Sequence, residues 1–419
     1  MRFLLVLVFA LIATAQPRVV VRAGKMLDVR AGRLLDDRAI VIENGDISAV
    51  MPFAEYKGEA SVKVVDLRNK TVLPGLIDAH VHVTFASNST PNAWLLTSAP
   101  RSALIGARNA RDLLNAGFTM IRNVGAGGYA DLALRDAIEA GDVVGPRMLT
   151  AGYSICITGG HCDSSSILPP DMKIEGPGAA DGEVSMERKV REQIKYGADL
   201  IKITATGGVM SARTDPRFPH MTLEEIKAVV KTAHGLGRKV ASHSHAAEGV
   251  KRSVEAGVDS IEHGHMMDDA AIAMMKAKGT YLVPTVALCE WNIANLDRSP
   301  MPEFNKRKMK LVCDVGVENV RKAIQAGVKI AFGTDTPVFP HGLNAREFGW
   351  YVKLGMTPID AIRSATLNGA DLLGVSDKMG VIETGKYGDL IAVDGNPLEN
   401  VRLLEDVKFV MKGGLVVKQ

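Results

Sequence analysis

The 419-residue sequence has no long run of basic residues and no apolar segment long enough to span a membrane. Its 50 lysines and arginines and 47 aspartates and glutamates are scattered along the chain, which argues against nucleic acid as a partner. The apolar run near the N-terminus, residues 3–12, covers ten residues, too few for a bilayer about 30 Å thick. The length and composition therefore predict a globular protein.

Cysteine is also scarce. The four cysteines, Cys156, Cys162, Cys289 and Cys313, are too few for a disulfide scaffold in a chain of this size. No Cys-x-x-Cys pair suggests a structural zinc site. We expect buried free thiols, although an oxidising compartment would permit a bridge between Cys156 and Cys162. With 47% hydrophobic residues, the chain can instead bury a large apolar core.

Residues 1–15 have the features of a secretory signal peptide. A charged start at Arg2 precedes the short apolar run, and the small residues Ala13-Thr14-Ala15 follow it. We expect cleavage after Ala15, a periplasmic or secreted mature protein, and no membrane span after cleavage. The alternative is a buried first strand, but residues 19–21 already supply one.

Strands and helices alternate between residues 74 and 383. The pattern predicts helices such as 223–236 and 318–326, and eight strands that end at residues 77–80, 119–123, 148–152, 200–203, 240–243, 260–263, 281–284 and 329–333. This alternation predicts an α/β fold, a (β/α)8 TIM barrel, whose chemistry lies at the C-terminal ends of the strands.

The two ends of the chain have a different pattern. Short β-branched runs separated by Gly, Asn and Asp occur in residues 16–73 and again in residues 384–419. These runs predict strands and hairpin turns. We expect both chain ends to build one small β-sandwich domain beside the barrel.

Histidines and one aspartate follow the predicted strands. His80 and His82 end the first strand, where a spacing of two places both imidazoles on one side. An isolated His-x-His motif is weak evidence for a metal. Further groups follow strands five, six and eight, namely His243, His245, His263, His265 and Asp335. Imidazole and carboxylate ligands without thiolates are typical of a catalytic Zn²⁺ site.

Lys202 lies within an apolar run at the end of the fourth predicted strand. An unpaired ammonium is costly to bury, and two interpretations remain open. Burial can depress the lysine pKa so that the amine reacts with carbon dioxide, giving a carbamate that bridges two cations. Alternatively, Lys202 forms an ion pair with an acid such as Asp335.

The order of these residues resembles the metal-dependent amidohydrolase superfamily. The motifs at residues 197–203, 206–211 and 257–263 resemble its branch of Xaa-Pro dipeptidases, zinc arginine or lysine carboxypeptidases and ochratoxinase. The resemblance extends from about Val19 to Lys418. It implies hydrolysis of an amide or peptide bond next to a C-terminal carboxylate, as in dipeptides, N-acyl amino acids or ochratoxin A-like amides.

The resemblance also implies a site with two Zn²⁺ ions. His80 and His82 would bind one ion together with Asp335, while His243 and His263 would bind the other. A carboxylated Lys202 would bridge both ions. A hydroxide between the metals would attack the amide, and Asp335 would transfer its proton to the leaving amine. Candidate substrate-binding residues are His161, Arg213, His245 and His265.

Three alternatives compete with this interpretation. A cyclic amidase of the imidazolonepropionase type is disfavoured by the export signal, because histidine breakdown is cytosolic. A single-metal deaminase does not need the lysine at position 202. A non-catalytic barrel would lack ligands, and all six are present. The segment 291–302 is either a lid over the site or an ordinary connection. The sequence is also compatible with a homo-oligomer.

Overall fold

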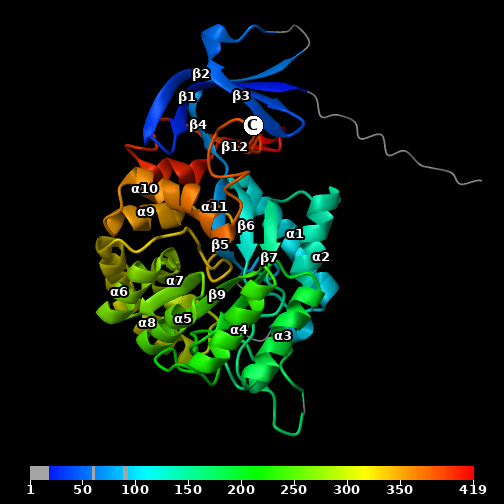
Figure 1. The fold of residues 1–419 in the computed structure, drawn as a ribbon, viewed down its shortest axis with the longest axis vertical. Helices are drawn as coiled ribbons and strands as arrows, with labels where there is room; N and C mark the ends of the chain where they lie inside the picture. The colour runs from blue at the N-terminus through cyan, green and yellow to red at the C-terminus, as the bar shows by residue number, and fades with distance from the viewer. Residues whose placement is uncertain (1–17, 59–61, 88–92, 173) are drawn as a thin grey trace, which may run out of the picture.

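The computed structural model describes residues 18–58, 62–87, 93–172 and 174–419. The predicted signal peptide therefore lies outside the described residues. Figure 1 shows a β domain at one end of the molecule and a larger body of strands and helices below it. Within the described part of the chain, no helix combines the length and the apolar character needed to cross a membrane.

Parallel strands in two sheets form the predicted barrel. The first sheet has the order β5-β6-β7 and the second β11-β10-β9-β8. Their bounds are β5 (Leu76–Val81), β6 (Phe118–Asn123), β7 (Arg147–Thr150), β8 (Leu200–Thr204), β9 (Lys239–Ala246), β10 (Ser260–Met266) and β11 (Tyr281–Val283). A bridge between Ile155 and Ile203 joins the two sheets on one side. The (β/α)8 prediction is confirmed.

The eighth strand is less regular than expected from residues 329–333. Ile330 makes an isolated parallel bridge to Leu282, and Thr336 makes another to Val81. Between them Asp335 adopts a φ of 61°, a left-handed conformation that cannot continue a β ladder. The segment still closes the barrel, because it lies between β11 and β5.

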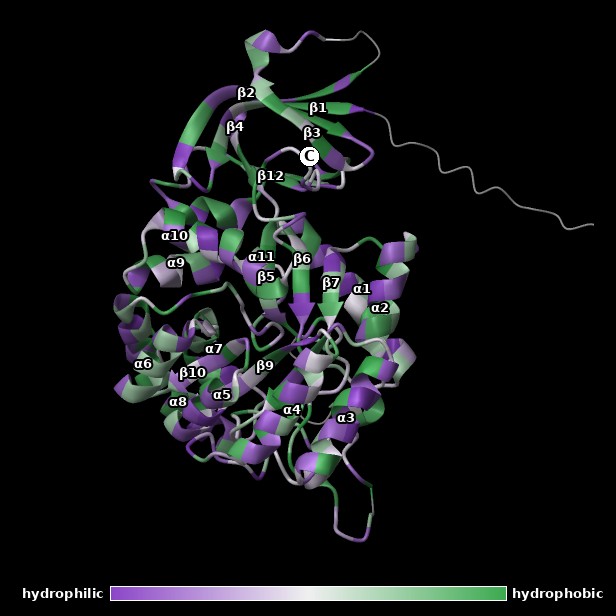
Figure 2. Ribbon diagram, in the orientation of Figure 1, coloured by the Kyte–Doolittle hydropathy of each residue, from purple (hydrophilic) through white to green (hydrophobic). Residues whose placement is uncertain are grey.

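Helices surround the strands (Figure 1). Their bounds are α1 (Ala99–Asn115), α2 (Ala130–Ala140), α3 (Glu183–Lys195), α4 (Leu223–Gly235), α5 (Ala247–Ala256), α6 (Asp269–Lys278), α7 (Ala287–Asn295), α8 (Glu303–Ala326), α9 (Arg346–Lys353), α10 (Pro358–Ser364) and α11 (Leu367–Leu373). A capping box between Thr222 and Glu225 starts α4, satisfying free backbone N–H groups. In Figure 2 purple and green alternate along α3 and α4, as expected for helices that bury one face.

Short 3₁₀ helices connect these elements, namely η1 (Phe53–Glu55), η2 (Ala93–Leu96), η3 (Ser164–Ile167), η4 (Leu296–Arg298) and η5 (Val401–Asp406). The segment 291–302 is therefore not a plain loop, because it contains the second half of α7 and η4. The side-chain amide of Asn295 also donates a hydrogen bond to the Trp291 carbonyl oxygen, at 2.7 Å.

Both chain ends build the β domain, as predicted. Its sheet has the order β14-β13-β12-β4-β1-β2-β3, with bounds β1 (Val19–Asp28), β2 (Arg33–Glu43), β3 (Asp46–Pro52), β4 (Lys63–Pro74), β12 (Leu390–Val393), β13 (Phe409–Lys412) and β14 (Leu415–Lys418). Val21, Ile40 and Val65 from the first part share one core with Phe409 and Met411 from the last. This shared apolar layer holds the chain ends together.

The expectation of free thiols is wrong. Cys156 and Cys162 form a disulfide across the loop after β7, where their Cα atoms lie 5.8 Å apart. Cys289 of α7 and Cys313 of α8 form a second disulfide, with Cα atoms 5.5 Å apart. The sequence places Cys289 and Cys313 24 residues apart, and only the packing of α7 against α8 brings them together.

The close packing at Gly333, where the eighth segment lies between β11 and β5, can be tested by substitution. A Cβ atom at Gly333 would lie 2.2 Å from Val283 Cγ1 and 2.8 Å from His80 Cβ, so Gly333→Ala forces β11 and β5 apart. We expect the free energy of unfolding to fall by about 1–3 kcal/mol, measured by urea denaturation. The control is Gly235→Ala at the end of α4, where no atom lies within 4 Å and we expect no loss. Equal stability of both variants would contradict the close packing.

Candidate active site

A first group of side chains lies where β5 meets the eighth segment. The Nε2 atoms of His80 and His82 each lie 3.3 Å from Asp335 Oδ1. The Nδ1 atom of His80 contacts Glu262 Oε2 at 2.6 Å, and that of His82 contacts the Gly125 carbonyl oxygen at 3.1 Å. Because each Nδ1 lies against an acceptor, each Nε2 is the ring nitrogen turned toward Asp335, and it is the atom that a metal ion would bind in place of a proton. Two imidazoles and one carboxylate thus converge as candidate metal ligands.

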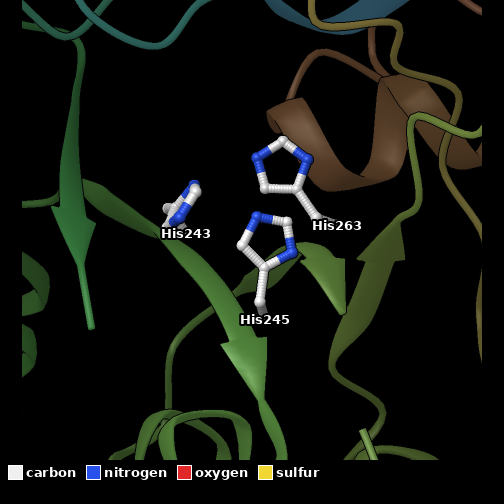
Figure 3. A group of neighbouring side chains, drawn as sticks. All are labelled: His243, His245 and His263. Atoms are coloured by element: carbon white, nitrogen blue, oxygen red, sulfur yellow. The ribbon is translucent and has the colours of Figure 1, made fainter. Parts of the chain in front are cut away.

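A second group consists of His243 and His245 from β9 and His263 from β10 (Figure 3). The candidate ligand atoms of these three buried residues all lie within 4.8 Å of one another. His263 Nδ1 contacts Thr285 Oγ1 at 2.8 Å, which orients the ring. His263 has a φ of 72°, so β10 bends at this point and turns its side chain toward β9.

The two groups are neighbours. The ring centroids of His80 and His263 lie 4.9 Å apart. Burial and mutual repulsion hold the pKa values of His243 and His263 well below the usual range, so both rings are neutral at pH 7. Burial by itself raises the pKa of Asp335, but contacts with His80 and His82 lower it below its usual range. The site therefore presents neutral imidazoles and an ionised carboxylate, the forms that bind metal ions.

Lys202 of β8 is buried, and its Nζ has no hydrogen-bond partner among the described residues. Burial lowers the pKa of Lys202 to about 8. The charge on Lys202 influences Asp335 on one side and His243 and His263 on the other. The ion pair with Asp335 that we considered is absent, because Asp335 contacts the two histidines of β5 instead. An unpaired amine in this position is available for reaction.

A cavity opens beside His243, His263 and Asp335, and three of the four predicted substrate-binding residues line it. His161 stacks on His243 with ring centroids 4.4 Å apart and contacts Ser211 Oγ through Nδ1 at 2.8 Å. His265 Nε2 donates to the Pro284 carbonyl oxygen at 2.7 Å. His245 also lines the cavity, where it joins the second group of candidate ligands.

The fourth, Arg213, is exposed on the loop after β8 and is not part of the cavity lining. Arg213 forms no ion pair with the nearby Asp215. Asp215 Oδ2 instead pairs with Arg217 Nη2 at 2.6 Å, which leaves Arg213 on the surface beside the site.

Sequence reasoning missed a buried ion pair behind the first group. Glu262 of β10 contacts His80 Nδ1 through one carboxylate oxygen and Arg122 Nη2 of β6 through the other, at 2.6 and 2.8 Å. Both side chains are at most 3% exposed. The charge of Arg122 and the hydrogen bond from His80 lower the pKa of Glu262, although burial opposes them. A charged residue within each apolar strand was the available signal, as at Lys202.

A buried carboxyl also supports the eighth segment. Asp78 Oδ2 accepts hydrogen bonds from Thr334 Oγ1 at 2.6 Å and from Asn344 Nδ2 at 2.8 Å. Asp78 lies two residues before His80, and Thr334 directly precedes Asp335. The network therefore ties together the two strands that carry the first group.

A (β/α)8 barrel with two ligand groups at the C-terminal ends of its strands defines the class as a metal-dependent hydrolase. The model of the Amidohydrolase family matches residues 71–417, which is most of the chain. The chain belongs to the amidohydrolase family.

Individual relatives of the chain are also enzymes. Ochratoxinase of Aspergillus niger is 34% identical over 373 residues, which cover 84% of this chain and 76% of that protein. The structure of a Xaa-Pro dipeptidase with bound methionine in the active site is 40% identical, with a TM-score of 0.91, covering 96% of this chain and all of that one. A prolidase complexed with N-methylphosphonate-L-proline is 31% identical, with a TM-score of 0.88, over 96% of this chain and all of that one. The branch predicted from the sequence is confirmed, and the chain is a hydrolase that acts on amide bonds.

The buried ion pair of Glu262 and Arg122 can be tested by substitution. Glu262→Gln removes the charge that Arg122 needs, and breaking a buried ion pair from one side costs about 3–5 kcal/mol. We expect a loss of that order in the free energy of unfolding, measured by urea denaturation.

A double variant separates folding from metal binding. Arg122→Met with Glu262→Leu replaces the ion pair by apolar side chains and should restore most of the stability. It also removes the acceptor for His80 Nδ1, so metal affinity should stay about 10–100-fold lower, measured by competition with a chelator. Wild-type metal affinity in the double variant would show that Glu262 does not orient His80.

The buried histidines generate a pH prediction. Burial lowers the pKa of His161 to about 3 and that of His265 to about 4, against about 6.5 in the unfolded chain. Below pH 6.5 the unfolded state therefore binds more protons than the folded state. As the pH falls through this range, the free energy of unfolding of the metal-free protein should decrease by about 1.4 kcal/mol per pH unit for each such histidine. Above pH 7 these groups are neutral in both states and contribute no slope.

Urea titrations at pH 7.5 and 5.0 measure this slope. His265→Gln removes one titrating group and should flatten it, whereas His234→Gln, at a half-exposed site beside Asp259, serves as the surface control. An unchanged slope in His265→Gln would contradict the assignment.

Proposed function

We propose that this protein is a binuclear zinc amidohydrolase that cleaves an amide or peptide bond next to a C-terminal carboxylate. One observation carries the proposal, namely a buried lysine amine without a partner beside two converging groups of metal-ligand side chains. A lone ligand group would be compatible with one ion. The arrangement of two groups around Lys202 supports two.

The residues present fit two divalent ions. His80, His82 and Asp335 would hold one ion, and His243 and His263 would hold the other. Lys202 would bridge them after its amine attacks carbon dioxide: a C–N bond would form, one C=O π bond of carbon dioxide would open to give the carboxylate, and the nitrogen would lose one proton. The resulting carbamate carries two oxygens and a negative charge, which balances the cations. The unpartnered Nζ supports this assignment, because a lysine already held in an ion pair would lose that interaction on reaction.

The chain's own residues then perform distinct tasks. Metal ions held by these residues would supply a water of lowered pKa and would polarise the substrate carbonyl. Asp335 is ionised and lines the cavity, so it can accept a proton from the attacking water and deliver it to the leaving nitrogen. His161 stacks on His243 and lines the cavity. Delivery of the proton is required because an amide nitrogen leaves poorly as an anion.

The substrates proposed are dipeptides, N-acyl amino acids and ochratoxin-like amides. Support comes from the relatives, which include an ochratoxinase, a Xaa-Pro dipeptidase and a prolidase. A free carboxylate next to the scissile bond needs a cation or several N–H donors. Arg213, exposed beside the cavity, is the candidate for that anchor.

We also propose that the mature protein is periplasmic or secreted. Residues 1–15 resemble a signal peptide, and both cysteine pairs are joined as disulfides. Disulfides persist in oxidising compartments and are rare in the cytosol. Cell fractionation with N-terminal sequencing of the mature protein tests this, and an intact Met1 in a cytosolic fraction would contradict it.

Lys202→Ala tests the bridged site. We expect about two zinc equivalents in the purified wild type and loss of both zinc and amide hydrolysis in the variant, because the bridge holds both ions. Elemental analysis and a dipeptide assay measure the two effects. The control is Lys231→Ala, on the exposed face of α4, which should retain both. One metal or none, with activity indifferent to Lys202, would refute the carbamate bridge.

Arg213→Ala tests the carboxylate anchor. We expect KM for dipeptides to rise about tenfold with kcat little changed, since an interaction made equally in ground and transition states affects binding alone. Esters that lack the free carboxylate should be unaffected. Arg217→Ala removes a neighbouring arginine that already pairs with Asp215 and should leave both substrates unchanged. Equal effects of Arg213→Ala on dipeptides and esters would remove the anchoring role.

A further inference from the structure

One wall of the active-site cavity is apolar. Apart from Asp335 and five imidazoles, the described residues that line the cavity are Val209, Met210, Leu288, Met309, Val312 and Val338. They come from the loop after β8, the start of α7, the first half of α8 and the segment after Asp335. No lysine, arginine or glutamate is among these lining residues. The wall therefore offers dispersion contacts to a substrate and no charge partner.

The ammonium group of Lys308, which precedes Met309 on α8, already has hydrogen-bond partners. Lys308 of α8 lowers the pKa of His161 through its charge, but its Nζ donates to three backbone carbonyl oxygens. These belong to Gly208, Ser211 and Thr214, at 2.9, 2.5 and 3.1 Å. Three donors with three acceptors leave nothing for a ligand. Lys308 instead fixes the loop that carries Val209 and Met210 against α8.

The disulfide between Cys289 and Cys313 fixes the other part of the wall. Cys289 is adjacent to Leu288 on α7, and Cys313 is adjacent to Val312 on α8. Both cysteines lie in one buried cluster with Val209, Met309 and Val312. Asn305 adds a hydrogen bond from α8 to the Val209 carbonyl oxygen. The apolar wall is thus a covalently joined helix pair with a loop tied to it.

We propose that this wall selects substrates by the side chain next to the scissile amide and that the selected side chain is neutral and apolar. The inference rests on the proposed function and narrows its substrate class. An arginine, lysine, aspartate or glutamate side chain would lose its hydration against the wall without gaining a partner. We expect such substrates to be hydrolysed at least about 100-fold less efficiently than those carrying leucine, methionine or phenylalanine.

A dipeptide panel tests the proposal. Zinc-loaded enzyme is assayed with Ala-X and X-Ala, where X is Leu, Met, Phe, Ala, Lys, Arg or Asp, so that X occupies either side of the bond. A kcat/KM at least about 100-fold higher for apolar than for charged X, in at least one of the two series, supports the inference. Equal or better hydrolysis of Lys, Arg or Asp overturns it while the amidohydrolase function stands. Hydrolysis of no dipeptide overturns the inference and removes dipeptides from the proposed substrates.

A charge placed in the wall gives a second test. Met309→Glu puts a carboxylate into the cavity, and we expect kcat/KM for X = Lys relative to X = Met to rise at least tenfold. Val315→Glu is the matched control, because Val315 lies on the same helix but is 39% exposed outside the cavity. It should leave the ratio unchanged. An unchanged ratio in Met309→Glu, with the protein folded by circular dichroism, overturns the role of the wall.

The disulfide between α7 and α8 can be tested separately. Replacing both Cys289 and Cys313 by Ala frees α7 from α8, and we expect kcat/KM for X = Phe to fall about tenfold while that for X = Ala changes less than threefold. Selective loss with the large side chain assigns the disulfide to the shape of the wall. An equal fall for both substrates would show that it supports folding only.

Discussion

Desolvation of ionisable groups at the C-terminal end of the barrel is the constraint on which this structure depends. Lys202, His243 and His263 are each at most 5% exposed, where charge is expensive. Neutral imidazoles and a lysine amine without a partner result directly from that burial. In an open, hydrated site Lys202 would keep the ordinary lysine pKa of about 10.4 and stay protonated at pH 7, and an ammonium group repels metal ions. The same environment makes the metal-free protein sensitive to acid.

Buried polar groups behind the site hold its ligands in place. Arg122 balances Glu262, which orients His80, while Asp78 holds the eighth segment through Thr334. These groups lie on β5, β6 and β10 and in the segment between β11 and β5, so ligand geometry and barrel closure use the same side chains. A change at any of them acts on both the fold and the site.

The barrel, the β domain and the candidate ligands could be predicted from the sequence because each leaves a local trace. Strand-helix alternation marks the barrel, and His80 and His82 stand directly after an apolar run. Arg122 was missed although it too interrupts an apolar strand, because no motif marks it. Arg213 was placed near the site by its loop, but only tertiary packing decides that it faces solvent. The bond between Cys289 and Cys313 likewise depends on how two helices pack, which no spacing in the sequence encodes.

The seven-stranded sheet is built from both ends of the chain, and this affects the order in which the protein can fold. Thr71 of β4 pairs with Val393 of β12, so the sheet cannot be completed until nearly the whole chain is available, whereas β5 to β11 pair largely with strands close in sequence. Contacts between distant segments form slowly. The barrel can therefore assemble while β1 to β4 still present an unpaired edge, and the last thirty or so residues close that edge. The C-terminal strands β12 to β14 therefore complete, as a last step, the sheet that β1 to β4 begin.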